Sequence, residues 1–216
     1  FLNKATIYKH GKTELKRNDI KSRFYTHCFN VYHDSELFGY IMFGPRSEII
    51  PQDSIQFKID NQQFYKRQRL EQRIKTVLSD LGLLFHNFTR QDIYIDFHHF
   101  NDALSFNDFI SLYQQKKIES KGKVKNWNVY STRVKSEMQI TGFSYGSRTS
   151  DKFLRCYNKT IELENVHKPY IKKFWELNGL NTNENVYRFE LQLNSKFFHK
   201  TTFAGKLNLH KKSSSI

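Results

Sequence analysis

Residues 144–162 read SYGSRTSDKFLRCYNKTIE, and the rest of the chain is organised around this stretch. A Gly-Ser-Arg turn runs into a short extended segment, in which successive side chains point to opposite sides. Arg155, Tyr157 and Lys159 fall on one side together with Phe153, so a phenol lies among cations. Neighbouring positive charge favours the phenolate, and a phenolate can attack a phosphodiester. On spacing alone, a partly buried aromatic residue on a charged surface is the favoured interpretation.

The chain of 216 residues is strongly basic. Its 35 lysine and arginine residues against 21 aspartate and glutamate residues leave a formal net charge of +14 at pH 7. Such a charge indicates an anionic partner, and nucleic acid is the leading candidate. A membrane is disfavoured as partner, because the sequence has no apolar run of about 18 residues and no basic amphipathic helix with a broad apolar face.

Aromatic and cysteine residues narrow the class of protein further. The 20 phenylalanine and 12 tyrosine residues are many for so polar a chain, and some of these rings could stack on unpaired bases. The only cysteines, Cys28 and Cys156, form neither a disulfide framework nor a zinc site, which indicates a reducing, cytoplasmic setting. The chain begins at Phe1 and shows no signal-peptide pattern, so we interpret it as a piece of a longer protein.

Hydrophobic periodicity predicts an α+β fold. Residues 1–24 are lysine-rich and weakly patterned, with one short strand near 5–8. Alternation and β-branched or aromatic content predict strands over residues 25–33, 37–43, 54–64, 88–100, 126–133, 137–145 and 186–193. We expect an antiparallel-rich central sheet with helices packed on one face and the active site on the other.

Helical spacing predicts three helices, over residues 66–83, 105–118 and 168–178. Ser105 is the expected N-cap of the second, with Asp108 three residues on. The length favours a single domain over 1–216. Within it we expect accessory strands for DNA recognition over 1–53, a basic loop over 119–125 and a disordered basic tail over 206–216.

Two of the predicted strands have an apolar back and an ionised front. One front carries Asp92 and Asp96, which lie about 13 Å apart along the strand, and the other carries Glu190. If the strands are neighbours, Glu190 can stand opposite either aspartate, and such oxygen ligands suit Mg²⁺ or Mn²⁺. The alternative is a salt-bridge ladder, made by Arg90, Asp92, Arg188 and Glu190.

Three separated segments resemble one family. Residues 88–96 resemble its Phe-Thr-Arg-x-Asp-x-x-x-Asp strand, 145–162 its Arg-x-Tyr-Asn-Lys-x-x-Glu segment and 187–193 its Arg-hydrophobe-Glu strand. The family is the replication initiation factors of rolling-circle plasmids and phages, with related relaxases of conjugative elements. Of the three motifs, the one in the middle is specific.

The resemblance implies a nicking and joining enzyme of the bacterial cytoplasm. Tyr157 looks like the nucleophile that attacks a phosphodiester at the origin and leaves a 5′-phosphotyrosine and a free 3′-OH primer. Asp92, Asp96 and Glu190 look like the ligands of a divalent metal, Mg²⁺ or Mn²⁺. The cations expected near the DNA are Arg90, Arg148, Arg155, Lys159 and Arg188. The expected partners are single-stranded or unwound origin DNA and a host helicase.

Two positions of the matched segments, two further tyrosines and three alternative functions remain to be named. Gln192 stands where the family often has a second glutamate, and Glu162 matches a family position without an assigned role. Tyr94 and Tyr145 are candidate stacking platforms for unpaired bases. The alternatives are a conjugative relaxase with the same chemistry, a non-catalytic DNA-binding module, and an RNA-processing nuclease that forms no covalent intermediate.

Overall fold

The computed structural model describes residues 7–19, 21–66, 69–100, 104–115, 117, 126–134 and 136–200. The chain divides into two compact units, Phe1–His86 (unit 1) and Asn87–Ile216 (unit 2). The predicted loop 119–125 and the predicted tail 206–216 lie outside the described residues. Whether the two units act as the single nicking domain expected from the sequence stays a prediction.

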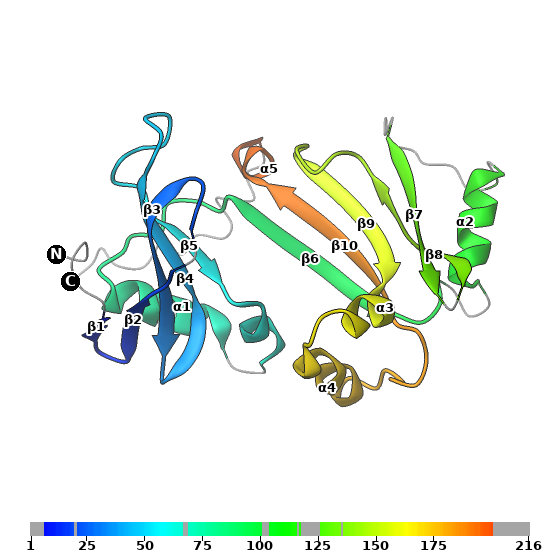
Figure 1. The fold of residues 1–216 in the computed structure, drawn as a ribbon, viewed down its shortest axis with the longest axis horizontal. Coiled ribbons are helices and arrows are strands. Elements are labelled where there is room, and N and C mark those ends of the chain that lie inside the picture. Colours follow the sequence, from blue (N-terminus) through cyan, green and yellow to red (C-terminus); the bar gives the residue numbers. More distant parts are fainter. Residues whose placement is uncertain are drawn as a thin grey trace, which may run out of the picture. The chain divides into compact units, whose positions relative to one another are not determined.

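Unit 1 contains a five-stranded antiparallel sheet in the order β1-β2-β3-β4-β5 (Figure 1). Its strands are β1 (Ile7–His10), β2 (Thr13–Arg17), β3 (Tyr25–His33), β4 (Glu36–Pro45) and β5 (Gln56–Ile59), and they are followed by a short 3₁₀ helix, η1 (Asn61–Tyr65), and by α1 (Leu70–Asp80). β3 has the predicted bounds. The predicted strand over 54–64 is shorter, because Asp60 accepts a hydrogen bond from the Gln62 amide and so caps η1.

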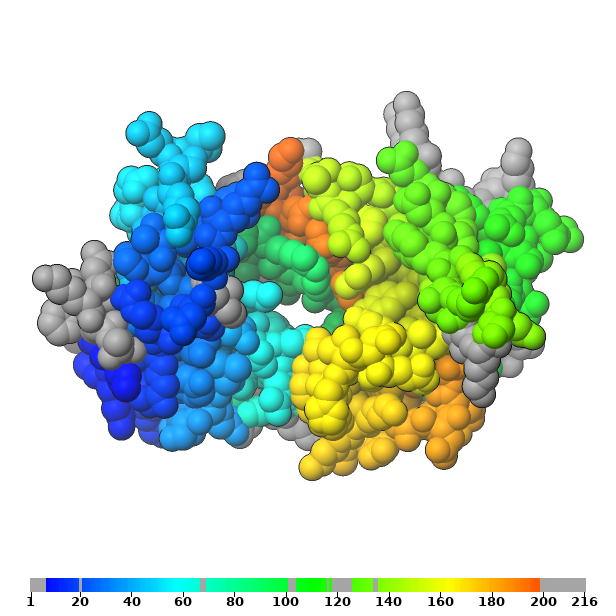
Figure 2. Space-filling model, in the orientation of Figure 1, coloured from blue at the N-terminus to red at the C-terminus, as the bar shows by residue number. Residues whose placement is uncertain are grey.

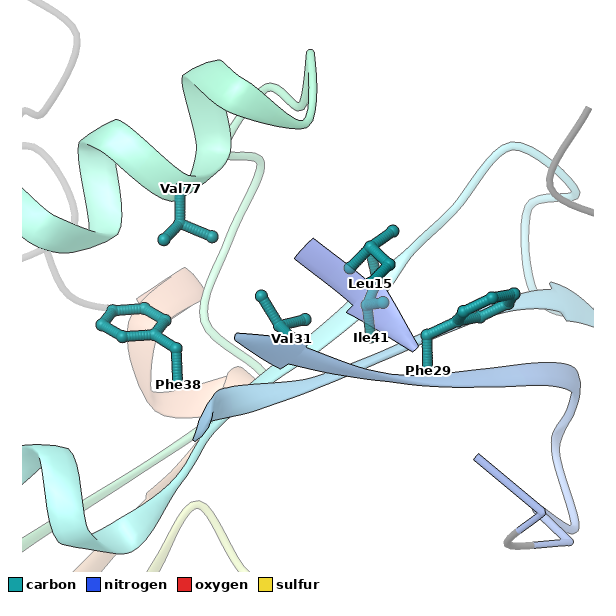
Figure 3. Close-up of a cluster of buried hydrophobic side chains, with 6 residues drawn as sticks. All are labelled: Leu15, Phe29, Val31, Phe38, Ile41 and Val77. Atoms are coloured by element: carbon teal, nitrogen blue, oxygen red, sulfur yellow. The ribbon is translucent and has the colours of Figure 1, made fainter. Parts of the chain in front are cut away.

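The core of unit 1 lies between this sheet and α1. Figure 3 shows Val77 of α1 above side chains of the sheet, and every one of these residues is at most 2% exposed: Leu15, Phe29, Val31, Phe38 and Ile41. Burial of each such side chain stabilises the fold by roughly 1.5–3 kcal/mol. The loop between β4 and β5 projects from unit 1 (cyan-blue, upper left in Figure 2), and Ile49 in it is almost fully exposed.

Unit 2 contains a second five-stranded antiparallel sheet, in the order β6-β10-β9-β8-β7 (Figure 1). Its strands are β6 (Arg90–Phe97), β7 (Trp127–Val134), β8 (Glu137–Tyr145), β9 (Lys152–Asn158) and β10 (Tyr187–Asn194). The α+β class is thus confirmed, with two sheets in place of the one central sheet expected. Because β10 pairs with both β6 and β9, the three strands that carry the motifs are neighbours.

The helices of unit 2 are α2 (Phe106–Gln114), α3 (Lys159–Glu164), α4 (Pro169–Leu177) and α5 (Ser195–Lys200). α2 begins with the predicted capping box, in which Ser105 and Asp108 bond reciprocally. α3 and α5 were not predicted, since six residues are too few for a helical hydrophobic pattern. Among the residues the structure describes, no helix has the length and apolar character needed to span a membrane.

The two faces of the unit 2 sheet differ in what covers them. On the back face, Phe143 and Cys156 are fully buried against Phe106 and Ile110 of α2. At the β6 edge of the same face, Ile93 and Ile95 remain exposed. The opposite, front face carries Tyr157 and the predicted acidic residues, and α4 reaches it through Trp175, whose indole Nε1 donates to Asp96.

Candidate active site

Strand register brings the predicted site residues together on the front face. In one row Asp96 stands opposite Arg188, and Arg188 stands opposite Tyr157. In the next row Glu190 lies between Tyr94 on β6 and Arg155 on β9. Directly opposed residues of an antiparallel pair share a face, and neighbouring strands lie roughly 4.8 Å apart. The nucleophile candidate and the acidic candidates therefore share one surface.

Tyr157 is in contact with a carboxylate and two cations. Its phenol donates a hydrogen bond to Glu190 Oε2 over 3.2 Å. The Arg155 guanidinium carbon and the Lys159 ammonium lie 4.8 Å and 5.5 Å from the centre of its ring. Burial raises the pKa of the Tyr157 phenol, and the charges of Glu190 and Glu162 raise it further. Arg188 and Arg155 lower the pKa of the phenol, in the direction expected for neighbouring cations, but burial and the two carboxylates outweigh them.

Lys159 reaches Tyr157 from a helix rather than from the strand predicted for it. β9 ends at Asn158, whose side chain accepts from the Ile161 amide and caps α3. Lys159 begins this helix, and its ammonium pairs with Glu162 one turn on. Burial lowers the pKa of the Lys159 ammonium. Glu162, which had no role from sequence, is thus the ion-pair partner of a buried lysine beside Tyr157.

Each of the three predicted metal ligands has an arginine partner. Arg188 binds Asp96 with Nε and Nη2, each over 2.7 Å, and both side chains are at most 6% exposed. Arg155 binds Glu190 Oε1 over 3.0 Å and 2.7 Å. On the β6 edge, Arg90 pairs with Asp92. The arrangement has the character of the salt-bridge ladder, with Arg155 as the partner of Glu190.

The three carboxylates as arranged do not fit a metal site. Among the described residues, no group of three or more His, Cys, Asp or Glu side chains is placed to hold a metal ion. Asp92 and Asp96 lie on either side of Tyr94 along β6, about 13 Å apart. Ligation by Asp96 would also need the loss of a bidentate arginine contact, and both oxygens of Glu190 are already engaged, Oε1 by Arg155 and Oε2 by Tyr157. The metal role of these residues stays a prediction.

The predicted DNA-binding cations differ in accessibility. Arg148 is exposed in the turn before β9, where its backbone oxygen accepts from the side-chain amides of Gln192 and Asn194. Half of the Arg90 side chain and a third of the Arg155 side chain are exposed. Arg188 and Lys159 are buried. Their contacts with DNA stay a prediction, and the arrangement offers Arg148, Arg90 and Arg155 most directly to a ligand.

The two tyrosines predicted to stack on unpaired bases, Tyr94 and Tyr145, lie on opposite faces of the unit 2 sheet. Tyr145 is on the back face, with its ring 4.6 Å from that of Trp127. Tyr94 is on the front face, with the Arg188 guanidinium 3.8 Å from its ring centre. Tyr130 is an exposed aromatic residue of the front face, and alternation within 126–133 could not assign it to a face without the register.

A glycine missed from sequence lets β8 approach the nucleophile candidate. Gly142 pairs with Tyr157, and a Cβ atom at Gly142 would lie 2.9 Å from Tyr157 Cβ and 2.8 Å from the Cys156 oxygen. Real Cβ atoms do not come so close to backbone atoms. Glycine in a strand interior often marks such a close approach, which is the signal that could have found it.

Comparisons with known proteins agree with this fold. The fold resembles that of the rolling-circle replication initiator protein from Geobacillus stearothermophilus, with a TM-score of 0.53 and 14% identity over 86% of this chain. The match spans 62% of the length of that initiator. No match was found among curated protein sequences. A family model described as replication initiation factor matches residues 86–206, more than half of the chain and all three motifs. The chain therefore belongs to the replication initiation factor family.

Proposed function

We propose that this chain is a rolling-circle replication initiator that nicks and rejoins origin DNA through Tyr157. The observation that supports this most is the hydrogen bond from the Tyr157 phenol to Glu190, on a face lined by arginine. A phenol that stays protonated until it loses its proton to a neighbouring base is an activated nucleophile of the kind that transesterification needs. Family membership supports a partner of DNA rather than RNA.

In the proposed reaction, the Tyr157 oxygen bonds to phosphorus and the bond between phosphorus and the 3′ oxygen breaks. The phenol proton passes to Glu190 Oε2 and then to the departing 3′ oxygen, which becomes the 3′-OH primer. The DNA 5′ end stays on the protein as a phosphotyrosine ester, and the reverse reaction rejoins the strand. Arg155, one third exposed and already beside Tyr157, stabilises the negative charge that develops on the phosphate oxygens.

The divalent metal implied by the family resemblance has no step in this scheme, because the carboxylates as arranged do not fit it. A bound Mg²⁺ or Mn²⁺ would act as a Lewis acid at the phosphate. Assays with Mn²⁺ and with EDTA test the requirement. Loss of cleavage in EDTA would mean that the arginine contacts of Asp96 or Glu190 open when DNA binds.

The test is Tyr157→Phe in the full chain, assayed on a single-stranded oligonucleotide that carries the origin of the element. We expect no covalent adduct on a denaturing gel and unchanged DNA binding. Tyr40→Phe, which removes a tyrosine hydroxyl in unit 1, is the matched control and should form the adduct normally. Unchanged cleavage by Tyr157→Phe would contradict the proposal. Binding without an adduct in the wild type would favour a DNA-binding module, and cleavage without an adduct a hydrolytic nuclease.

A further inference from the structure

Tyr130 is an exposed aromatic side chain in the same row of the front face as Tyr157. It pairs with Gly142, and Gly142 pairs with Tyr157, so two strand spacings, roughly 10 Å, separate the two tyrosines. Because Gly142 has no side chain, the row carries none between them. Tyr130 is 44% exposed, which is high for so large an aromatic residue in the interior of a strand.

The Tyr130 ring is held in place although it is exposed. Its hydroxyl hydrogen-bonds to the hydroxyl of Ser144 over 2.5 Å, and Ser144 is fully buried. The register shifts directly after Tyr130, because the facing strand β8 has an extra residue, Thr141, between the partners of Tyr130 and Ser131, and such β-bulges are common next to active sites. A ring that is fixed before a ligand arrives loses little conformational entropy on binding.

We propose that Tyr130 forms a base-binding subsite, which stacks on an unpaired base of the DNA strand that reaches Tyr157. The inference rests on the proposed nicking function, since it takes that strand as the ligand. Aromatic faces stack on any base, so the subsite takes unpaired nucleotides of any sequence. Arg155, the cation proposed above to act on the scissile phosphate, stands opposite Ser144 in the row beside Tyr130 and Gly142, so the subsite lies next to the position of that phosphate.

Binding measurements in a Tyr157→Phe background test the subsite without any need for cleavage. The probes are a fluorescent oligothymidylate and an oligomer of the same length with abasic residues throughout. The Kd of the abasic oligomer divided by the Kd of oligothymidylate measures how much the bases contribute to binding. We expect Tyr130→Leu to reduce this ratio about 5- to 150-fold, because this is the loss of affinity expected when one base no longer stacks on an aromatic ring. Tyr130→Phe, which keeps the ring, should preserve the ratio.

Phe64→Leu is the matched control, because Phe64 is a similarly exposed aromatic residue in unit 1. It should leave the ratio unchanged, and circular dichroism should show that every variant is folded. An unchanged ratio in Tyr130→Leu, or equal weakening of both oligomers, would overturn the proposal. Because Tyr157 is replaced in every protein compared, this result is independent of the adduct assay, which tests the nicking function by itself.

Discussion

The Tyr157 phenol donates a hydrogen bond to Glu190, with 3.2 Å between Tyr157 Oη and Glu190 Oε2. Arg155 holds the other oxygen of the same carboxylate, so a proton acceptor is oriented at the proposed nucleophile by a fixed neighbour. The contact joins two adjacent strands, β9 and β10. Glu190 therefore has a role to test that requires no metal.

Glu190→Gln should slow adduct formation about 100-fold or more, because glutamine keeps the shape of the side chain but cannot take the proton. The loss of the Glu190 charge should also lower the pKa of Tyr157, since burial is the largest cause of the raised pKa and the charge of Glu190 is the next largest. Alkaline absorbance titration of the tyrosines measures the second effect. Glu162→Gln is the control: it also removes a charge that raises the Tyr157 pKa, but it should slow adduct formation much less. Equal rates in Glu190→Gln and the wild type would exclude Glu190 as the proton acceptor.

Asp96→Asn should destabilise unit 2 by about 3–5 kcal/mol, because it leaves Arg188 buried without its counter-charge. Asp92→Asn breaks a pair that is one third to one half exposed and should cost less than about 1 kcal/mol. Both tryptophans, Trp127 and Trp175, belong to unit 2, so their fluorescence during urea unfolding measures the difference. Similar stabilities for the two variants would contradict the interpretation of Asp96–Arg188 as a buried ion pair.

Gly142→Ala should slow adduct formation, because its Cβ would collide with Tyr157 Cβ and the Cys156 oxygen. A displacement of about 1 Å at a reacting group can cost 100-fold in rate. Gly39→Ala provides the comparison in unit 1, where the new Cβ would lie 2.3 Å from the Lys58 oxygen. It should lower the stability of unit 1 but leave the rate per folded molecule intact. A normal rate for Gly142→Ala would show that Tyr157 tolerates the shift.

Gln192→Glu should weaken activity, although it restores the glutamate that the family often has. Gln192 Nε2 donates to the Arg148 oxygen and to Asn194, and a carboxylate there would face two acceptors. Hydrogen exchange over residues 146–151 should therefore become faster. If Gln192→Glu instead raised Mn²⁺ affinity and the nicking rate, the carboxylates would be acting as a metal site.

Prediction from sequence succeeded where the pattern was long or had a specific cap. β3 and α2 were predicted well because nine residues rich in β-branched and aromatic side chains and a capping box leave little choice. β1 overlaps the short strand expected near 5–8, but β2, with five mostly polar residues, offered no periodicity to detect. Alternation also sorted β6, β9 and β10 into the correct faces.

Which residues of the site touch one another could not be predicted. Asp96 and Arg188 are 92 positions apart, and their contact depends on the order of strands in the sheet. For the same reason the burial of the ionised front of β10 was not predicted: Arg188 and Glu190 are covered by the side chains with which they pair on β6 and β9. Lys159 was assigned to a strand because the N-cap role of Asn158 was not recognised.

The alternation along β10 also has a genetic consequence. Arg188 and Glu190 face the nucleophile, while Phe189 between them and Leu191 after them face the opposite layer. A substitution of Arg188 or Glu190 can harm the chemistry and spare the apolar packing, whereas a substitution of Phe189 or Leu191 can harm the packing and spare the chemistry. A one-codon insertion or deletion in the middle of β10 would turn every following side chain to the wrong face and damage both. In a mutational scan of this gene, β10 should accept exchanges of residues far more readily than changes of length.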